Sequence, residues 1–310
     1  MSSGKPTNIA ASVRQKLLNL AHDTGRPFNA VLQFYAMERF LYRLSVSEHK
    51  DKLILKGALM LIAWQAPSVR PTTDLDFLGR LSNDPPTVAD MIRTICSLGV
   101  EDDGLVFDPA SIKAESITED ADYRGIRVRF TGKLDAARVT MQLDIGFGDI
   151  LIPAPERVEY PTLLEMPKPV ICGYSRESSI AEKLEAMMKL GMANSRMKDF
   201  YDIWYLSRWF EFEGAVLLRA ISATFDRRGT DLSKSPIVFS REFGENSQKQ
   251  SQWSAFISKN GLDGAPATLK EVAGEIRVFL GPVIEAIIDH QSLSKVWSAK
   301  AKWRLPGGRN

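Results

Sequence analysis

The chain has 310 residues, 44% of them hydrophobic, which is enough to bury a core and to form two domains. Its 40 basic and 38 acidic residues leave a net charge of +2, so no strong overall field attracts nucleic acid. Cys96 and Cys172 stand in no paired motif, no apolar run spans a membrane, and residues 1–7 lack a signal-peptide core. These features exclude a disulfide framework and membrane insertion, and we expect a cytoplasmic protein.

The predicted elements begin with two helices. A capping box at residues 12–15 opens the first helix, which ends at Gly25, and Pro27 starts the second. Residues 53–152 then indicate a sheet region. Residues 153–169 contain five prolines, too many for regular structure, and mainly helical patterns follow them.

The first motif in the sheet region combines a glycine turn with two carboxylates. Lys56, Gly57 and Ala58 precede a short helical run, and Asp74 and Asp76 follow that run. If the aspartates lie in a strand, its period of two places both on one face. Two carboxylates at 4 Å repel each other by about 1 kcal/mol in water, and a divalent cation such as Mg²⁺ relieves that repulsion.

A glycine turn that opens a helix also offers backbone N–H groups to a phosphate. The order strand, glycine turn, helix and strand with paired aspartates is that of the nucleotidyltransferase fold. The alternative is a solvated strand end, because the Asp-x-Asp spacing is common.

A third acid is predicted at Asp144. Residues 137–145 alternate, with apolar side chains on one face and Asp144 on the other, and residues 124–130 alternate in the same way. The two segments predict a β-hairpin whose turn lies in residues 131–136, with Gly132 as the turn residue. Asp144 is then a base or third metal ligand, and a solvent-exposed aspartate is the alternative.

Two helices follow in the second half of the chain. In residues 180–191, Lys183 lies at the edge of the apolar stripe, and the opposite, polar side carries Glu182, Glu185 and Lys189. The next helix, residues 194–204, has a polar face made by Lys198, Asp199 and Asp202.

The remainder of the chain is predicted to contain a loop and one more helix. Residues 229–251 are polar and predict a long loop. Residues 269–289 predict a last helix with a kink at Pro282.

These segments resemble the AbiEii/AbiGii nucleotidyltransferase toxins of type IV toxin–antitoxin systems. The matching motifs stand in the family's order and are KGALML with RPTTDLDF, QLDIGFGD, AEKLEAMMKLG and NSRMKDFYDIW. The resemblance spans roughly residues 12–225. It implies a bilobed protein that uses a nucleoside triphosphate and a divalent metal, and a tRNA 3′ end as the acceptor in several relatives.

The resemblance also assigns roles to individual residues. Gly57, with Lys56 and Ala58, belongs to the phosphate-facing turn, Asp74 and Asp76 to the metal pair, and Asp144 to the third-acid strand. Lys183 matches a phosphate-contacting lysine, and the NSRMKDFYDIW helix supplies Lys198, Asp199 and Asp202. Where the wider nucleotidyltransferase pattern has Gly-Ser, this chain has Gly57-Ala58 and lacks a hydroxyl.

The predicted fold is α/β (α+β), with a nucleotidyltransferase-type lobe over residues 1–165 that contains a small mixed sheet, and an α-helical lobe over residues 166–310. The predicted function is metal-dependent transfer of a nucleotide from a nucleoside triphosphate to RNA, with a winged-helix antitoxin as a possible partner. The alternatives are a nucleotide-binding toxin without transferase activity, and transfer to a protein or a small molecule.

Basic side chains that could contact the RNA fall into two groups. They are Arg124, Arg127 and Arg129, or, near the C-terminus, Lys295, Lys300, Lys302, Arg304 and Arg309. A solvated strand face and a frayed basic tail are the respective alternatives.

Overall fold

The computed structural model describes residues 8–67, 70–119, 123–299 and 302–307. The chain divides into two compact units. Unit 1 comprises Met1–Gly148 and Glu156–Gly173, and unit 2 comprises Asp149–Pro155 and Tyr174–Asn310.

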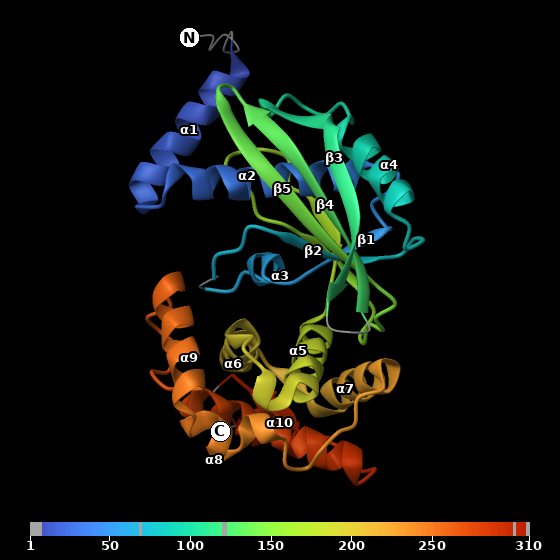
Figure 1. Ribbon diagram of the computed structural model, residues 1–310, viewed down its shortest axis with the longest axis vertical. Coiled ribbons are helices and arrows are strands. Elements are labelled where there is room, and N and C mark those ends of the chain that lie inside the picture. Colours follow the sequence, from blue (N-terminus) through green and yellow to red (C-terminus); the bar gives the residue numbers. More distant parts are fainter. Residues whose placement is uncertain (1–7, 68–69, 120–122, 300–301, 308–310) are drawn as a thin grey trace. The chain divides into compact units, whose positions relative to one another are not determined.

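Unit 1 is built on a seven-stranded mixed sheet (Figure 1). Its helices are α1 (Ile9–Thr24), α2 (Phe28–Val46), α3 (Leu59–Ala63) and α4 (Pro85–Cys96). Its strands are β1 (Leu53–Lys56), β2 (Leu75–Gly79), β3 (Leu105–Glu119), β4 (Tyr123–Leu134), β5 (Ala137–Phe147), β6 (Glu156–Glu159) and β7 (Val170–Gly173). The strand order is β3-β4-β5-β2-β1-β7-β6, with β2–β5 and β1–β7 parallel and the other pairs antiparallel. The predicted mixed sheet is therefore confirmed, as is the order strand, glycine turn, helix and strand around Gly57.

The predicted hairpin is also confirmed, as β4 and β5, and its turn lies inside the predicted residues 131–136, but Gly132 is not a turn residue. Leu134 pairs with Ala137, so the turn is made by Asp135 and Ala136, and Asp135 has a φ of 52°. Aspartate tolerates this left-handed conformation better than most residues. Gly132 lies inside β4 instead, where a Cβ would press on the side chains of Phe107 and Val139.

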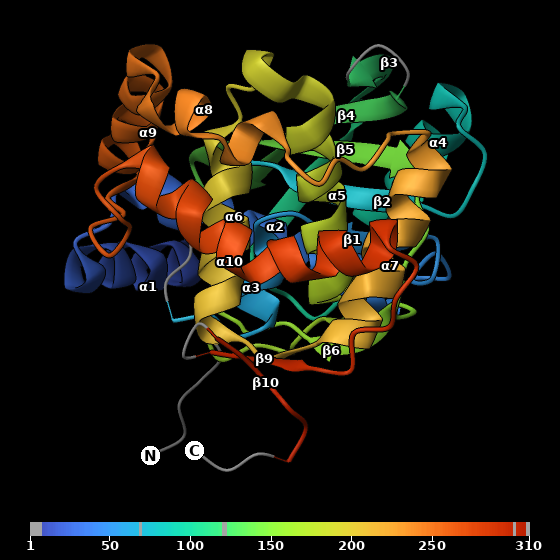
Figure 2. The ribbon, with the colours of Figure 1, turned by 90° about the horizontal axis from the view of Figure 1, so that it is seen from below.

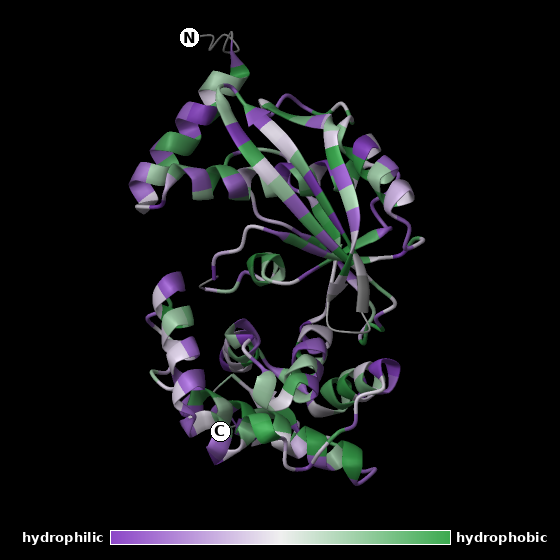
Figure 3. Ribbon diagram, viewed as in Figure 1, coloured by the Kyte–Doolittle hydropathy of each residue, from purple (hydrophilic) through white to green (hydrophobic). Residues whose placement is uncertain are grey.

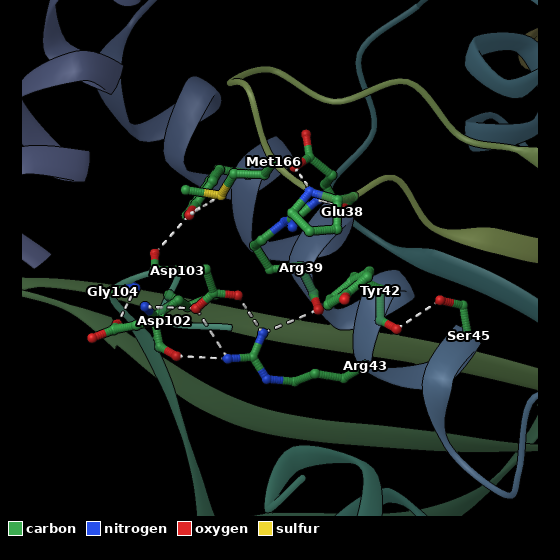
Figure 4. A network of polar contacts seen from close by, with 12 residues as sticks. Glu38, Arg39, Tyr42, Arg43, Ser45, Asp102, Asp103, Gly104 and Met166 are labelled. Atoms are coloured by element: carbon green, nitrogen blue, oxygen red, sulfur yellow. Dashed lines mark hydrogen bonds and ion pairs between the residues drawn. The ribbon is translucent and has the colours of Figure 1, made fainter. Parts of the chain in front are cut away.

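Helix α2 packs against the sheet and carries buried charges (Figure 4). Arg43 donates to both carboxylate oxygens of Asp103, at 2.7 and 3.1 Å, and to the carbonyl of Leu105 at 2.9 Å. Glu38 and Arg39 form a second buried pair, 2.7 Å apart. Buried ions are tolerated only when they are paired and hydrogen-bonded. The contacts of Arg43 join α2 to Asp103 and to the start of β3, whereas the Glu38–Arg39 pair lies within α2 itself.

Two predictions for the ends of unit 1 need correction. Helix α1 ends at Gly25 as predicted, with a φ of 65°, but it begins at Ile9 with Asn8 as its N-cap, so the predicted capping box at Ser12 lies inside the helix. The proline-rich segment is not wholly irregular: it contains β6, and β7 begins directly after it. Its prolines fall outside both strands, so no ladder hydrogen bond is lost.

Unit 2 is mainly helical, as predicted. Its helices are α5 (Arg176–Leu190), η1 (Gly191–Ala193), α6 (Met197–Trp209), α7 (Gly214–Arg228), η2 (Ile237–Phe239), α8 (Arg241–Glu245), α9 (Ser247–Asn260) and α10 (Leu269–Ile288). The chain also forms a small sheet from β8 (Phe212–Glu213), β9 (Val296–Ser298) and β10 (Lys302–Arg304). These strands are too short to give a periodic signal in the sequence.

Helix α10 is the apolar centre of unit 2. It contacts α6 and α7, crosses both in Figure 2, and is largely hydrophobic in Figure 3. Pro282 lies within it, as predicted. The predicted loop over residues 229–251 is interrupted by η2, α8 and the start of α9, so that prediction was wrong in part. Among the described residues, no helix is both long and apolar enough to cross a membrane.

Candidate active site

A row of charged side chains crosses the sheet of unit 1. Lys56 of β1 pairs in register with Asp76 of β2, and Asp76 pairs with Asp144 of β5. Asp144 pairs in turn with Arg127 of β4, and Arg127 with Glu115 of β3. Register partners on adjacent strands point to the same face, so these five side chains form one row with two neighbouring carboxylates near its centre.

Gly57 directly follows Lys56 at the end of β1 and lies against Asp76. Its φ is +74°, and a Cβ built on it would lie 2.1 Å from Oδ2 of Asp76. Only glycine meets both the backbone and the space requirement. Asp76 lies at a small hollow of about 20 Å³. The hollow is lined by Lys56, Asp76, Ile117, Gly125, Asp144, Ile145 and Gly146. Lys56, Gly57, Asp76 and Asp144, all predicted from the sequence, therefore come together.

Asp144 is buried, not solvent-exposed. Nε and Nη2 of Arg127 each donate to one of its carboxylate oxygens, both at 2.7 Å, and Gln142 donates at 3.3 Å. The sequence had offered Arg127 as a phosphate contact for RNA. Its fork geometry instead matches the carboxylate, which keeps the negative charge of Asp144 compensated beside Asp76.

The neighbouring arginine is also engaged. Arg129 donates to Glu115 at 2.7 Å and to Gln142 at 3.0 Å. The side chain of Arg124, the third member of the predicted group, lies outside the described part of the chain.

The other two predicted residues of this region flank the row. Asp74 is half-buried, lies one residue before β2 begins, and accepts a 2.5 Å hydrogen bond from Oγ1 of Thr73. Ala58 is the N-cap of α3 and is 2% exposed. The methyl group of Ala58 is therefore buried, and the side chain at this position makes apolar contacts.

A second group of predicted residues lies in unit 2. Nζ of Lys183 is 3.1 Å from Oδ1 of Asp199 and 2.8 Å from Oδ2 of Asp202. Nε of Arg196, which the sequence analysis did not select, donates to Oδ2 of Asp199 at 2.8 Å. The polar face predicted for α6 is therefore not solvated, since the two aspartate side chains are only 1% and 3% exposed. Lys198 remains exposed.

The predicted polar side of α5 is covered in part, since Lys189 is exposed whereas Glu182 and Glu185 pair with Arg228. Glu185 is buried and accepts from Nη1 of Arg228 at 2.8 Å, and Asp149 accepts from Nη2 of the same arginine at 2.9 Å. Burial alone lowers the pKa of Arg228, but Glu182 and Asp149 outweigh it and raise the pKa above its ordinary value. Glu185 is buried because α5 packs against both α6 and α7, which no single-helix pattern reveals.

The carboxylates of unit 1 fit a hard divalent cation. Mg²⁺ usually takes one or two protein carboxylates and completes its shell with water and substrate phosphate. Asp74 and Asp76 can supply such oxygens, and Asp144 lies beside Asp76 in the row. Within the residues that the structure describes, no group of three or more His, Cys, Asp or Glu side chains is arranged to hold a metal ion.

Comparison with known proteins identifies the family. The family model described as "Nucleotidyl transferase AbiEii toxin, Type IV TA system" matches residues 39–275. The chain belongs to this family. The resemblance predicted from the motifs is confirmed, and every predicted site residue of this AbiEii protein lies inside the matched region.

More distant similarities were found among solved structures. A crystal structure described as a nucleotidyltransferase from H. pylori is 14% identical, with a TM-score of 0.46, over 84% of this chain and 97% of that chain. JHP933 from Helicobacter pylori is also 14% identical, with a TM-score of 0.43, over 84% and 94%. These values are too low to support an argument about function. No curated protein matches the chain.

Proposed function

We propose that this AbiEii-family protein is a cytoplasmic toxin that transfers a nucleotide from a nucleoside triphosphate to the 3′ end of a tRNA, and that it depends on a divalent cation. The observation that carries the proposal is the in-register pair of Asp76 and Asp144, closed on one side by the Gly57 turn. Two adjacent carboxylates beside a lysine and a tight glycine turn form a site for a metal–triphosphate complex.

In this proposal Asp74 and Asp76 would hold Mg²⁺, which when bound would lower the pKa of the acceptor hydroxyl. The hydroxyl oxygen forms a bond to the α-phosphorus, the bond from that phosphorus to the bridging oxygen breaks, and pyrophosphate leaves. Asp144 receives the hydroxyl proton or serves as a further ligand, with Arg127 orienting its carboxylate.

The residues of unit 2 are assigned to substrate binding. Lys183 offsets phosphate charge, and Asp199 and Asp202 hold its ammonium in place. Lys198 is exposed and available to a phosphate of the nucleotide or the acceptor.

The decisive experiment incubates the protein with each labelled nucleoside triphosphate, Mg²⁺ and total tRNA. We expect label in the RNA, none after chelation of the metal, and none with Asp76→Asn. Glu115→Gln is the matched control, because Glu115 stands in the same row but is exposed. Transfer at the wild-type rate by Asp76→Asn would refute the two-carboxylate site.

One observation keeps a second candidate open, namely a toxin that binds nucleotide without transferring it. Ala58 stands where the wider pattern has a serine, so a phosphate-binding hydroxyl is absent. Nucleotide binding without labelled RNA would favour this candidate, or an acceptor that is a protein or small molecule. The type IV family implies an antitoxin partner, which we propose to be of the winged-helix type.

A further inference from the structure

A buried lysine of helix α9 contacts the segment before α6, which leads to the group formed by Lys183, Arg196, Asp199 and Asp202. Only two residues of this helix, Lys249 and Trp253, are buried in the described structure. Lys249 is 6% exposed, and its Nζ donates to the backbone carbonyl of Asn194 at 2.7 Å. The same Nζ lies 5.6 Å from the centre of the Phe243 ring.

This environment satisfies the ammonium only in part. A lysine carries three N–H donors, and the contacts of Nζ among the described residues are one carbonyl oxygen and one ring face. Burying an ammonium without a carboxylate partner is costly, and apolar replacements of buried ions are often neutral or stabilising. The stability of the fold therefore does not account for a lysine at this position.

Asn194, whose carbonyl Lys249 holds, is the first of a series of residues joined by polar contacts. Asn194 is fully buried, and its Oδ1 accepts from the backbone N–H of Arg196 at 2.7 Å. Nε of Arg196 donates to Asp199 at 2.8 Å, and Asp199 contacts Nζ of Lys183 at 3.1 Å. Lys249 thus lies at one end of this chain and Lys183 at the other.

The aromatic contacts of this region reinforce the connection. The Phe243 ring, which faces Nζ of Lys249, stacks on Phe200 with centroids 5.5 Å apart. Phe200 directly follows Asp199 in α6. The lysine is therefore linked to the start of α6 both through hydrogen bonds and through stacked rings.

We infer that Lys249 is a positioning residue that fixes the segment before α6, and through it Arg196, Asp199 and Lys183, in the geometry that binds the nucleotide. The role of the nucleotide rests on the proposed function; the mechanical role of Lys249 does not. Its ammonium acts through the Asn194 carbonyl and need not touch substrate.

The test compares Lys249→Met with Lys259→Met, a matched change at an exposed lysine of the same helix. For Lys249→Met we expect a melting temperature equal to or above that of the wild type, together with about tenfold weaker nucleoside triphosphate binding. Lys259→Met should change neither. Lys249→Arg keeps a cationic donor and should recover part of the affinity.

Amide hydrogen exchange supplies a readout that needs no nucleotide. Lys249→Met should speed exchange in residues 194–199 and leave α10 unchanged. If the wild type binds no triphosphate, the proposed function fails, yet faster exchange in this segment still supports the positioning role. Unchanged exchange overturns the inference, and so does a loss of affinity that merely follows a lower melting temperature.

Discussion

Gly57 combines a left-handed backbone with a neighbouring carboxylate that leaves no room for a side chain. Gly25 has a similar φ, +65°, but nothing lies within 4 Å of a Cβ built there. Gly25→Ala therefore isolates the backbone strain, which is roughly 1–2 kcal/mol. Gly57→Ala should add displacement of the Asp76 carboxylate, destabilise the protein further, and weaken nucleotide binding. Denaturant unfolding and nucleotide titration measure both effects, and equal results for the two variants would contradict the close approach to Asp76.

Glu38 makes the stability of unit 1 depend on pH. Burial raises the pKa of Glu38 to about 7, and the nearby Arg39 opposes this effect only in part. Because the folded state binds the proton more tightly than the unfolded chain, the stabilisation by protonated Glu38 is complete below about pH 4.5 and is lost as the pH rises through about 7.

Replacement of Glu38 by glutamine should remove this titration. Between pH 4.5 and 8 the free energy of unfolding of the wild type should fall relative to that of Glu38→Gln, by roughly 3 kcal/mol. Glu159→Gln, at an exposed strand position, should follow the wild type. Parallel stability curves for the wild type and Glu38→Gln would show that folding does not raise the pKa of Glu38.

At the scale of elements, Lys183 joins α5 to α6 by neutralising two buried aspartates. Its removal leaves Asp202 without this partner and Asp199 with Arg196. Since removing one partner of a buried ion pair costs about 3–5 kcal/mol, Lys183→Met should destabilise the protein by up to an amount of this order.

The control for this change is Lys189→Met, at an exposed position on the same helix, which should cost less than about 0.5 kcal/mol. Denaturant titration measures the difference, and nucleotide binding is then compared under conditions in which both variants are folded. Equal stabilities would mean that the Lys183 ion pairs are not formed in solution.

At the scale of the whole molecule, the near balance of charge means that binding of the proposed RNA acceptor depends on local basic groups. Arg127 and Arg129 are engaged by acids in the sheet, whereas Lys295 and Lys302 are exposed. Lys300 and Arg309 lie outside the described residues. The C-terminal lysines are therefore the better candidates for phosphate contacts.

Replacing Lys295 and Lys302 together by glutamine should flatten the salt dependence of tRNA binding. Each phosphate contact contributes about 0.7–0.9 log units per tenfold change in salt, so the slope should fall by roughly 1.4–1.8. Arg129→Gln should leave the slope unchanged. The opposite pattern would return the RNA surface to β4.

The sequence by itself determined the local features of this protein. Alternation along β4 and β5 predicted the hairpin and placed Asp144 on its polar face, and the order of motifs around Gly57 predicted the strand–turn–helix–strand unit. These predictions succeed because periodicity and glycine conformation depend on a few neighbouring residues.

The tertiary structure decided what covers each face. The Asp135–Ala136 turn sets the hairpin register and so places Arg127 on Asp144, whereas the predicted range of residues 131–136 leaves this register undefined. Asp199 and Asp202 are buried because other helices surround α6, a fact that the pattern of one helix does not contain. The contact of Lys249 with Asn194 joins residues 55 positions apart, and only the packing of α9 brings them together. The local sequence therefore determined which charged residues share a face of a strand or helix, and the packing of the elements determined which of these residues form ion pairs.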